Sequence, residues 1–266
     1  HTKTPADIIS YSQQFGEFVS FKLDNMQLQH DELYADATPT PKAPHKPIAM
    51  IAISNGEGIA DLFSSFGCDV VIDGGQTMNT SAQEILDAIG SLSADKIVVY
   101  PNHENIFKAA EQAVALSGQS NVVIMPAKSV MQCYYSMAMD IADCEDVEQR
   151  LRMLENGCHA IAVTSVTQCV KNCVCNGVVC LKGEYVVISD GDPIACVPTY
   201  LDVVQVLLDR HLLENAEMCI VFCGKDAIGF SEEEFQKAVE AQSPMLEVAF
   251  VEGNQRIYDL IIGVVI

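Results

Sequence analysis

Residues 47–75 read PIAMIAISNGEGIADLFSSFGCDVVIDGG, and this stretch decides the fold. The apolar run at residues 48–53 predicts a buried strand, a turn at residues 54–58 ends it, and a helical stretch extends to Phe66. A second apolar run, residues 69–72, ends in another glycine-rich turn. A strand, a glycine-rich turn, a helix and a second strand in this order indicate a βαβ unit of a parallel sheet.

The same alternation of short apolar runs and amphipathic stretches continues to residue 139. It predicts helices at residues 81–92, 104–116 and 128–139, and strands at residues 96–100 and 122–125. We therefore expect a first α/β lobe at residues 48–142, with a mostly parallel sheet covered by helices on both faces. Sites in such sheets lie at the carboxyl ends of the strands.

The pattern changes after a predicted helix at residues 144–156, because strands then dominate. Alternation across residues 167–179 indicates a β-ribbon. The other predicted elements are strands at residues 160–166, 178–181, 185–188, 218–222, 246–251 and 259–265, and helices at residues 199–213 and 232–242. Residues 143–266 are therefore expected to form a second lobe of mixed α/β type.

The N-terminal part of the chain has a different character. Residues 5–15 predict a helix and residues 18–23 a strand, which is too little to fold alone. Residues 36–47 contain four prolines and no large apolar side chain, so they predict an extended linker. The chain begins at His1 without an initiator methionine, and we expect it to be an excised fragment.

Composition excludes several classes of function. Of 266 residues, 15 are Lys or Arg and 36 are Asp or Glu, which gives a net charge of −21. A nucleic acid or an anionic membrane surface would repel most of this protein, so neither is an expected partner. The longest apolar runs, residues 48–53 and 260–266, are too short for a membrane anchor. Most of the 11 cysteines lie in apolar runs and their number is odd, which favours a cytoplasmic protein.

Two glycine-rich turns are candidate sites, at residues 54–58 and 73–81. Each places small residues, hydroxyls and backbone N–H groups between a strand and a helix, where a carboxylate or phosphate can bind. Glu57 disfavours an anion at the first turn. The alternative is structural, with tight turns and with Thr80 or Ser81 as a helix cap.

Cysteines and histidines give weaker signals. Cys169, Cys173, Cys175 and Cys180 lack the paired spacing of structural zinc sites, so we expect no metal there. No histidine has a visible base or nucleophile partner, and no Walker, Gly-x-Ser-x-Gly or kinase motif occurs.

Three motifs carry a resemblance over nearly the whole chain. They are Ser54-Asn55-Gly56-Glu57-Gly58, Gly74-Gly75-Gln76-Thr77-Met78-Asn79 and Tyr100-Pro101-Asn102-His103-Glu104-Asn105-Ile106. In these residues the sequence resembles the C-terminal region of the A subunit of fatty-acid kinase, in the dihydroxyacetone-kinase-like family. His1-Thr2, Asn25-Met26 and Gln29-His30 are similar to the end of that family's middle domain, so residues 1–35 are identified as its remnant.

The resemblance implies a function for the intact protein. ATP and magnesium bind in an N-terminal domain that this chain lacks, so no cofactor is expected here, and His1 is implied as catalytic only in the intact protein. The C-terminal lobes are similar to the DegV-type fatty-acid-binding partner. They are implied to dock that acyl-loaded partner so that the kinase can phosphorylate the acyl carboxylate.

The resemblance also supplies a set of residues for binding a ligand or the partner. They are Ser54, Gly56, Gly58, Gly74, Gly75, Gln76, Thr77, Asn79, Ser81, Asn102 and Asn105. Departures from the family pattern occur at Thr80, at Lys171-Asn172 in the ribbon, and at residues 252–256, which read EGNQR. If the ribbon or this last loop contacts the partner, specificity has drifted.

Other functions stay open. The chain could be a lipid-binding module itself, with the acyl chain between the lobes and its carboxylate at the Gly74 to Ser81 loop. An independent hydrolase or phosphatase is least favoured, because no nucleophile and base are recognisable as a pair. A homodimer is a further alternative.

Overall fold

The structure is a computed structural model, and it describes residues 5–14, 44–75, 78–141, 144–210, 213 and 216–265. The chain divides into two units, His1–Pro41 and Lys42–Ile266. In the first unit, helix α1 (Pro5–Ser12) occupies the predicted helical segment. The predicted strand at residues 18–23 lies outside the described residues.

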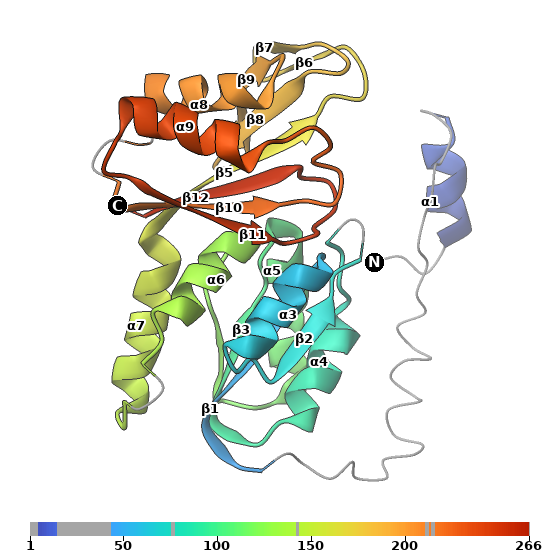
Figure 1. The fold of residues 1–266 in the computed structure, drawn as a ribbon. Helices are drawn as coiled ribbons and strands as arrows, with labels where there is room; N and C mark the ends of the chain where they lie inside the picture. Colours follow the sequence, from blue (N-terminus) through green and yellow to red (C-terminus); the bar gives the residue numbers. More distant parts are fainter. Residues whose placement is uncertain are drawn as a thin grey trace. The chain divides into compact units, whose positions relative to one another are not determined.

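A four-stranded parallel sheet begins the second unit (Figure 1). Its strands, in the order β2-β1-β3-β4, are β1 (Lys46–Ser54), β2 (Val70–Asp73), β3 (Ala94–Tyr100) and β4 (Val122–Ile124). β1 is central and is buried on both faces from Ile48 onward, which explains its unbroken apolar sequence. The parallel sheet predicted for the first lobe is confirmed.

Helices cover both faces of this sheet. They are α3 (Glu57–Ser65), α4 (Ala82–Ser91), α5 (Glu104–Ser117) and α6 (Val130–Ala138). α4 and α5 pack on one face, where Ile89 and Ile106 join Ile51 in one apolar cluster. α3 and α6 pack on the other face, where Phe63 and Met131 lie in a second cluster.

The second sheet has six strands in the order β11-β10-β12-β5-β8-β9. They are β5 (Ile161–Gln168), β8 (Tyr185–Ser189), β9 (Asp192–Val197), β10 (Met218–Cys223), β11 (Glu247–Glu252) and β12 (Leu260–Val265). β10 and β11 run parallel and the other neighbours antiparallel, so the mixed sheet is confirmed. Helices α8 (Tyr200–Asp209) and α9 (Glu232–Gln242) cover its outer face around Val203 and Phe235.

A two-stranded ribbon, β6 (Cys173–Cys175) and β7 (Val178–Cys180), follows β5. The sequence predicted that the ribbon begins at residue 167, but residues 167 and 168 belong to β5. Among the described strands, β7 pairs with β6 alone, whereas β8 pairs with β5 and β9. β9 lies in a segment for which the sequence predicted no strand.

One apolar core joins the two sheets. Helices α3 and α6, with α7 (Val147–His159), lie between them, and their core cluster also includes Ile220 and Ile261 of the second sheet. Inside it, Tyr100 hydrogen-bonds Ser136 at 2.9 Å, and the Ser136 hydroxyl donates to the Leu154 carbonyl at 2.6 Å. The lobes therefore share a continuous interior between residues 48 and 265.

Within the described part of the chain, no helix has both the length and the apolar character needed to cross a bilayer.

Candidate functional site

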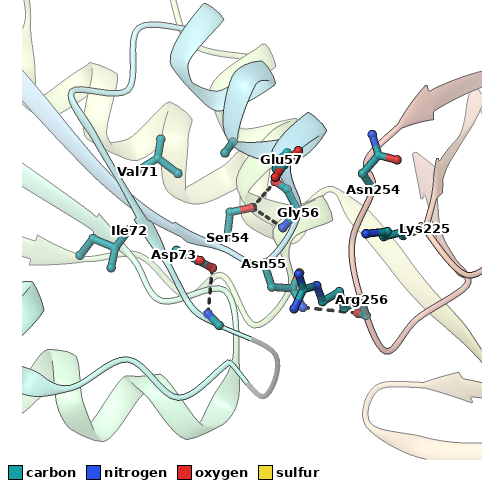
Figure 2. A pocket seen from close by; sticks show the side chains of 12 residues that line it. Ser54, Asn55, Gly56, Glu57, Val71, Ile72, Asp73, Lys225, Asn254 and Arg256 are labelled. Atoms are coloured by element: carbon teal, nitrogen blue, oxygen red, sulfur yellow. Dashed lines mark hydrogen bonds between the residues drawn. The ribbon is translucent and has the colours of Figure 1, made fainter.

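Two cavities open at the carboxyl edge of the parallel sheet, where the second lobe faces it. The first, of about 430 Å³, is lined by the ends of β1 and β2 and by Lys225, Asn254 and Arg256 (Figure 2). The second, of about 320 Å³, lies beside Asn102, at the end of β3. Strand order reverses between β1 and β3, and this edge is where open α/β sheets bind ligands.

The first glycine-rich turn joins the two lobes. A Cβ atom at Gly58 would overlap the carbonyl oxygen of Glu252, and one at Gly56 would lie 2.8 Å from the Gln255 nitrogen. The absence of both side chains lets the β11–β12 loop approach helix α3. Gly56 and Gly58 therefore act in packing between the lobes.

Hydrogen bonds reinforce this contact. The Ile59 N–H, in the first turn of α3, donates to the Gly253 carbonyl at 3.2 Å, so part of the helix's positive end is already used. The Asn55 side-chain amide donates to the Arg256 carbonyl at 3.4 Å. The Ser54 side chain is 2% exposed and bonds only within its own turn, to Gly56.

Opposite charges line the first cavity. Glu57 and Asp73 come from the first lobe, and Lys225 and Arg256 come from loops of the second lobe (Figure 2). Neither of these two cations forms an ion pair with any residue that the structure describes. The cavity can therefore hold an anionic group against the second lobe, in a chain whose net charge is strongly negative.

The second glycine-rich turn is held by its own backbone. Gly74 N–H donates to the Ser54 carbonyl at 2.6 Å, Gly75 N–H to the Asp73 carboxylate at 2.9 Å, and Asn79 N–H to the Gly74 carbonyl at 3.0 Å. These three N–H groups are therefore not free for an anion. Gln76 and Thr77 lie outside the described residues.

Ser81 begins helix α4 with a capping box. Its hydroxyl accepts the Glu84 N–H at 3.3 Å, and the Glu84 carboxylate accepts the Ser81 N–H at 2.8 Å. This is the structural role that the sequence left open for Ser81. Thr80 is 5% exposed, and its buried hydroxyl has no hydrogen-bond partner among the described groups.

Asn102 connects three strand ends. Its side-chain amide donates to the Ile53 carbonyl at 2.8 Å, near the end of β1, and its backbone N–H donates to the Ala127 carbonyl after β4. Its own φ of +59° is rare for residues other than glycine. Asn102 lines the second cavity, and its side-chain oxygen is buried and has no hydrogen-bond partner among the described groups.

His103 caps helix α5. Its Nδ1 atom accepts the Asn105 N–H at 3.2 Å, and partial burial lowers the pKa of its imidazole. The Asn105 side chain is exposed and also lines the second cavity.

Four thiols of this chain are poor nucleophiles. Burial raises the pKa of Cys68, Cys219 and Cys223 to about 12 and that of Cys158 to about 11, so they stay protonated near neutral pH. Cys169, Cys173, Cys180 and Cys196 pack together under the ribbon, while Cys175 is exposed. The described residues contain no group of three or more His, Cys, Asp or Glu side chains arranged to hold a metal ion.

The structure thus sorts the described candidate residues into three groups. Ser54, Gly56 and Gly75 lie at the first cavity, and Asn102 and Asn105 at the second; Gly58, Gly74, Asn79 and Ser81 line neither. His1 lies outside the described residues. Lys225, Asn254 and Arg256 were not among the residues predicted from sequence, although the last two stand in the 252–256 loop that departs from the family pattern.

Comparison with known proteins gives a family match and curated relatives. A family model for the C-terminal region of proteins like the A subunit of fatty acid kinase (FakA-like) matches residues 49–265. "Protein YloV" of Bacillus subtilis is 31% identical over 268 residues, covering 99% of this chain and 48% of that protein. A protein of Staphylococcus aureus strain RF122 is also 31% identical, over 99% of this chain and 48% of its own length. The chain therefore spans about half the length of these relatives.

Solved structures share the fold at low sequence identity. A DegV family protein of Ruminococcus gnavus superposes with a TM-score of 0.57 and 13% identity, covering 82% of this chain and 99% of that one. The fatty acid kinase B3 protein of Streptococcus pneumoniae, solved with linoleic acid, has a TM-score of 0.53 and 9% identity, covering 84% of this chain and 100% of that one. The two-lobed DegV-like fold predicted from sequence is confirmed.

Proposed function

The chain belongs to the FakA-like C-terminal family of fatty acid kinase proteins, and from this premise we propose that it is a docking region without catalytic activity of its own. It receives an acyl-loaded, DegV-type fatty-acid-binding protein and presents the acyl carboxylate to a kinase domain elsewhere in the longer protein. The match over residues 49–265 is the observation that carries this proposal.

The rest of the longer protein supplies the phosphoryl-transfer chemistry in this proposal. ATP and magnesium bind there, and His1 contributes only in that context. The relatives' length supports this division, because this chain covers 48% of "Protein YloV". The raised thiol pKa values support it too, since an activated nucleophile needs the opposite shift.

A binding measurement tests the proposal directly. The purified chain is titrated with a DegV-family protein of the same organism, once loaded with fatty acid and once lipid-free. We expect saturable binding that is tighter for the loaded form, because only the loaded form is a substrate carrier. Absence of binding to both forms would contradict the proposal, as would turnover of ATP, Mg²⁺ and fatty acid by this chain alone.

Variants at the second glycine-rich turn locate the contact. Asn79 is exposed at this turn, and Asn79→Ala is expected to weaken partner binding about tenfold, which corresponds to about 1.4 kcal/mol. Gln236→Ala on helix α9, also exposed, is the matched control and should leave the dissociation constant unchanged. Equal binding by both variants would remove residues 73–81 from the interface.

The second candidate is a lipid-binding module. It is favoured by the fold shared with the fatty acid kinase B3 protein solved with linoleic acid. The acyl carboxylate would lie at the Gly74 to Ser81 loop, with the chain between the lobes. Native mass spectrometry of the protein purified from cells decides it, because a retained fatty acid supports this candidate and a lipid-free mass contradicts it.

A further inference from the structure

The β6–β7 ribbon has two different faces. Its turn, Asn176-Gly177, has φ values of +47° and +84°, typical of the two-residue turn that fits the twist of a hairpin. Because side chains alternate along a strand, the Cys173 and Cys180 pair points inward and the Val174 and Val179 pair points outward.

The inward face anchors the ribbon. Cys180 is 1% exposed and packs with Cys169 and Val186 of the mixed sheet's lobe. At the base, the Lys182 N–H donates to the Asn172 side chain at 2.7 Å. These contacts therefore hold the ribbon in place on the second lobe, with its outward face exposed.

The outward face is apolar and exposed. Val174 is 68% exposed and Val179 63%, and these two side chains lie directly opposite each other. Val170, at 80%, and Leu181, at 46%, extend the apolar surface at the ribbon's base. Single exposed apolar residues are ordinary, but a contiguous group on one element marks an interaction surface.

Positive charge borders this surface. Lys171 and Lys182 are both exposed, and neither forms an ion pair with a residue within the described ranges. The chain as a whole has 36 acidic and only 15 basic residues, so two unpaired lysines beside an apolar surface form a local exception. They complement carboxylates on a partner and repel basic surfaces.

We propose that the outward face of the ribbon is the docking surface for a partner protein whose apolar contact is bordered by carboxylates. This inference rests on the proposed docking function and adds a contact surface to the one tested at residues 73–81. Four aliphatic side chains cover far less than the ~1,200–2,000 Å² that a stable interface buries, so they suit a transient partner better than a permanent second copy of this chain. A carrier that must arrive loaded and leave empty needs such a transient contact.

The test uses the full chain and an acyl-loaded DegV-family protein of the same organism. The double variant Val174→Thr/Val179→Thr keeps β-branched side chains and the hairpin but adds hydroxyls to the exposed face. We expect binding to weaken at least tenfold. Met245→Thr is the matched control, because Met245 is 95% exposed and lies beside β11, at the opposite edge of the sheet from β9; its binding should be unchanged.

The lysines are tested by association rate. Lys171→Gln/Lys182→Gln should slow association several-fold at low salt and reduce its salt dependence, with little change in the dissociation rate. Circular dichroism and the urea midpoint of each variant show whether the fold is intact.

The outcomes separate the two proposals. If the wild-type chain binds neither form of the partner, the proposed function fails and the ribbon assignment fails with it. If wild type binds and the valine variant binds equally well, only the ribbon assignment is overturned. Sedimentation of the chain alone gives the remaining outcome: a dimer that dissociates in the valine variant would show that a second copy occupies the ribbon, and would also overturn it.

Discussion

The two glycine-rich turns have similar sequences and different structural roles. In the first, at residues 54–58, glycine is required by what lies outside the turn, because Gly56 and Gly58 contact the backbone of residues 252–255 in the other lobe. In the second, Gly75 has a φ of +64° and nothing within 4 Å of its missing side chain, so glycine is required by the turn itself. The comparison shows that a glycine motif alone does not distinguish a ligand site from a lobe contact.

The difference predicts that the first turn is the less tolerant of a side chain. Gly58→Ala places a methyl group on the Glu252 carbonyl, which belongs to backbone and cannot rotate away, so we expect the free energy of unfolding to fall by roughly 3 kcal/mol. Urea unfolding measures it. Gly90→Ala is the control: Gly90 lies inside helix α4 with open space around it, and there alanine should stabilise by about 0.5–1 kcal/mol.

Asn102 extends the comparison to the end of β3. Asn102→Ala removes a buried hydrogen bond to Ile53 and leaves alanine at φ +59°, so we expect a loss of about 2 kcal/mol in unfolding free energy. Asn102→Gly relieves the backbone strain but not the lost hydrogen bond, and should be less harmful. An alanine variant as stable as Asn105→Ala, whose side chain is exposed, would show that this connection is dispensable.

The β11–β12 loop, which contacts the first glycine-rich turn, ends at Asp259, and the protonation of this side chain changes with pH. Gly224 N–H donates to the Asp259 carbonyl, and the Asp259 side chain, 5% exposed, accepts a hydrogen bond from Tyr200 at 3.2 Å. Burial raises the pKa of Asp259 from 3.8 to about 6. The folded state therefore holds this proton more tightly than the unfolded state does.

It follows that Asp259 lowers stability as pH rises from about 4 to about 6, by roughly 2 kcal/mol, and adds no further change above that range. Unfolding free energy measured across this pH window should fall less steeply in Asp259→Asn than in wild type. Asp87→Asn, on the exposed face of helix α4, is the control and should keep the wild-type slope. Parallel slopes in wild type and Asp259→Asn would contradict the assignment.

The smallest effect is expected at the second turn. Gly75→Ala meets no neighbouring atom and bears only the cost of a positive φ, about 1 kcal/mol. Differential scanning calorimetry can compare it with Gly58→Ala. If Gly75→Ala is the more destabilising of the two, the distinction between the turns is wrong.

Local pattern was sufficient for most of the fold. The predicted strand at residues 48–53 and the predicted helix at residues 104–116 match β1 and α5 to within two residues at each end. Such elements can be predicted because strand burial and helix periodicity depend on residues that are close in sequence. β9 was missed because Asp192 and Pro193 at its start are typical of turns. The sequence predicted a β-ribbon at residues 167–179 but not the exact bounds of β6 and β7, because register depends on partners and not on strand sequence.

The site was less accessible to prediction for the same reason. Gly56 meets Gly253 and Gln255 across about 200 residues of sequence, a separation that no local periodicity records. Lys225 and Arg256 could not be recognised as site residues from sequence, because only the fold brings their loops to the same cavity as Asp73. The motifs do share one edge of the sheet, since Ser54 ends β1 and Asn102 follows β3.

Helices α3, α6 and α7 share one apolar core with both sheets, so a hinge motion between the lobes would have to break that core. Folds that clamp a ligand use hinges that absorb large backbone rotations, and here such a rotation would expose Tyr100 and its hydroxyl network to water. The distance between the two lobes on either side of the cavities is therefore set when the chain folds. Under the proposed docking function, a bound partner would therefore meet two lobes whose spacing is fixed by their shared core.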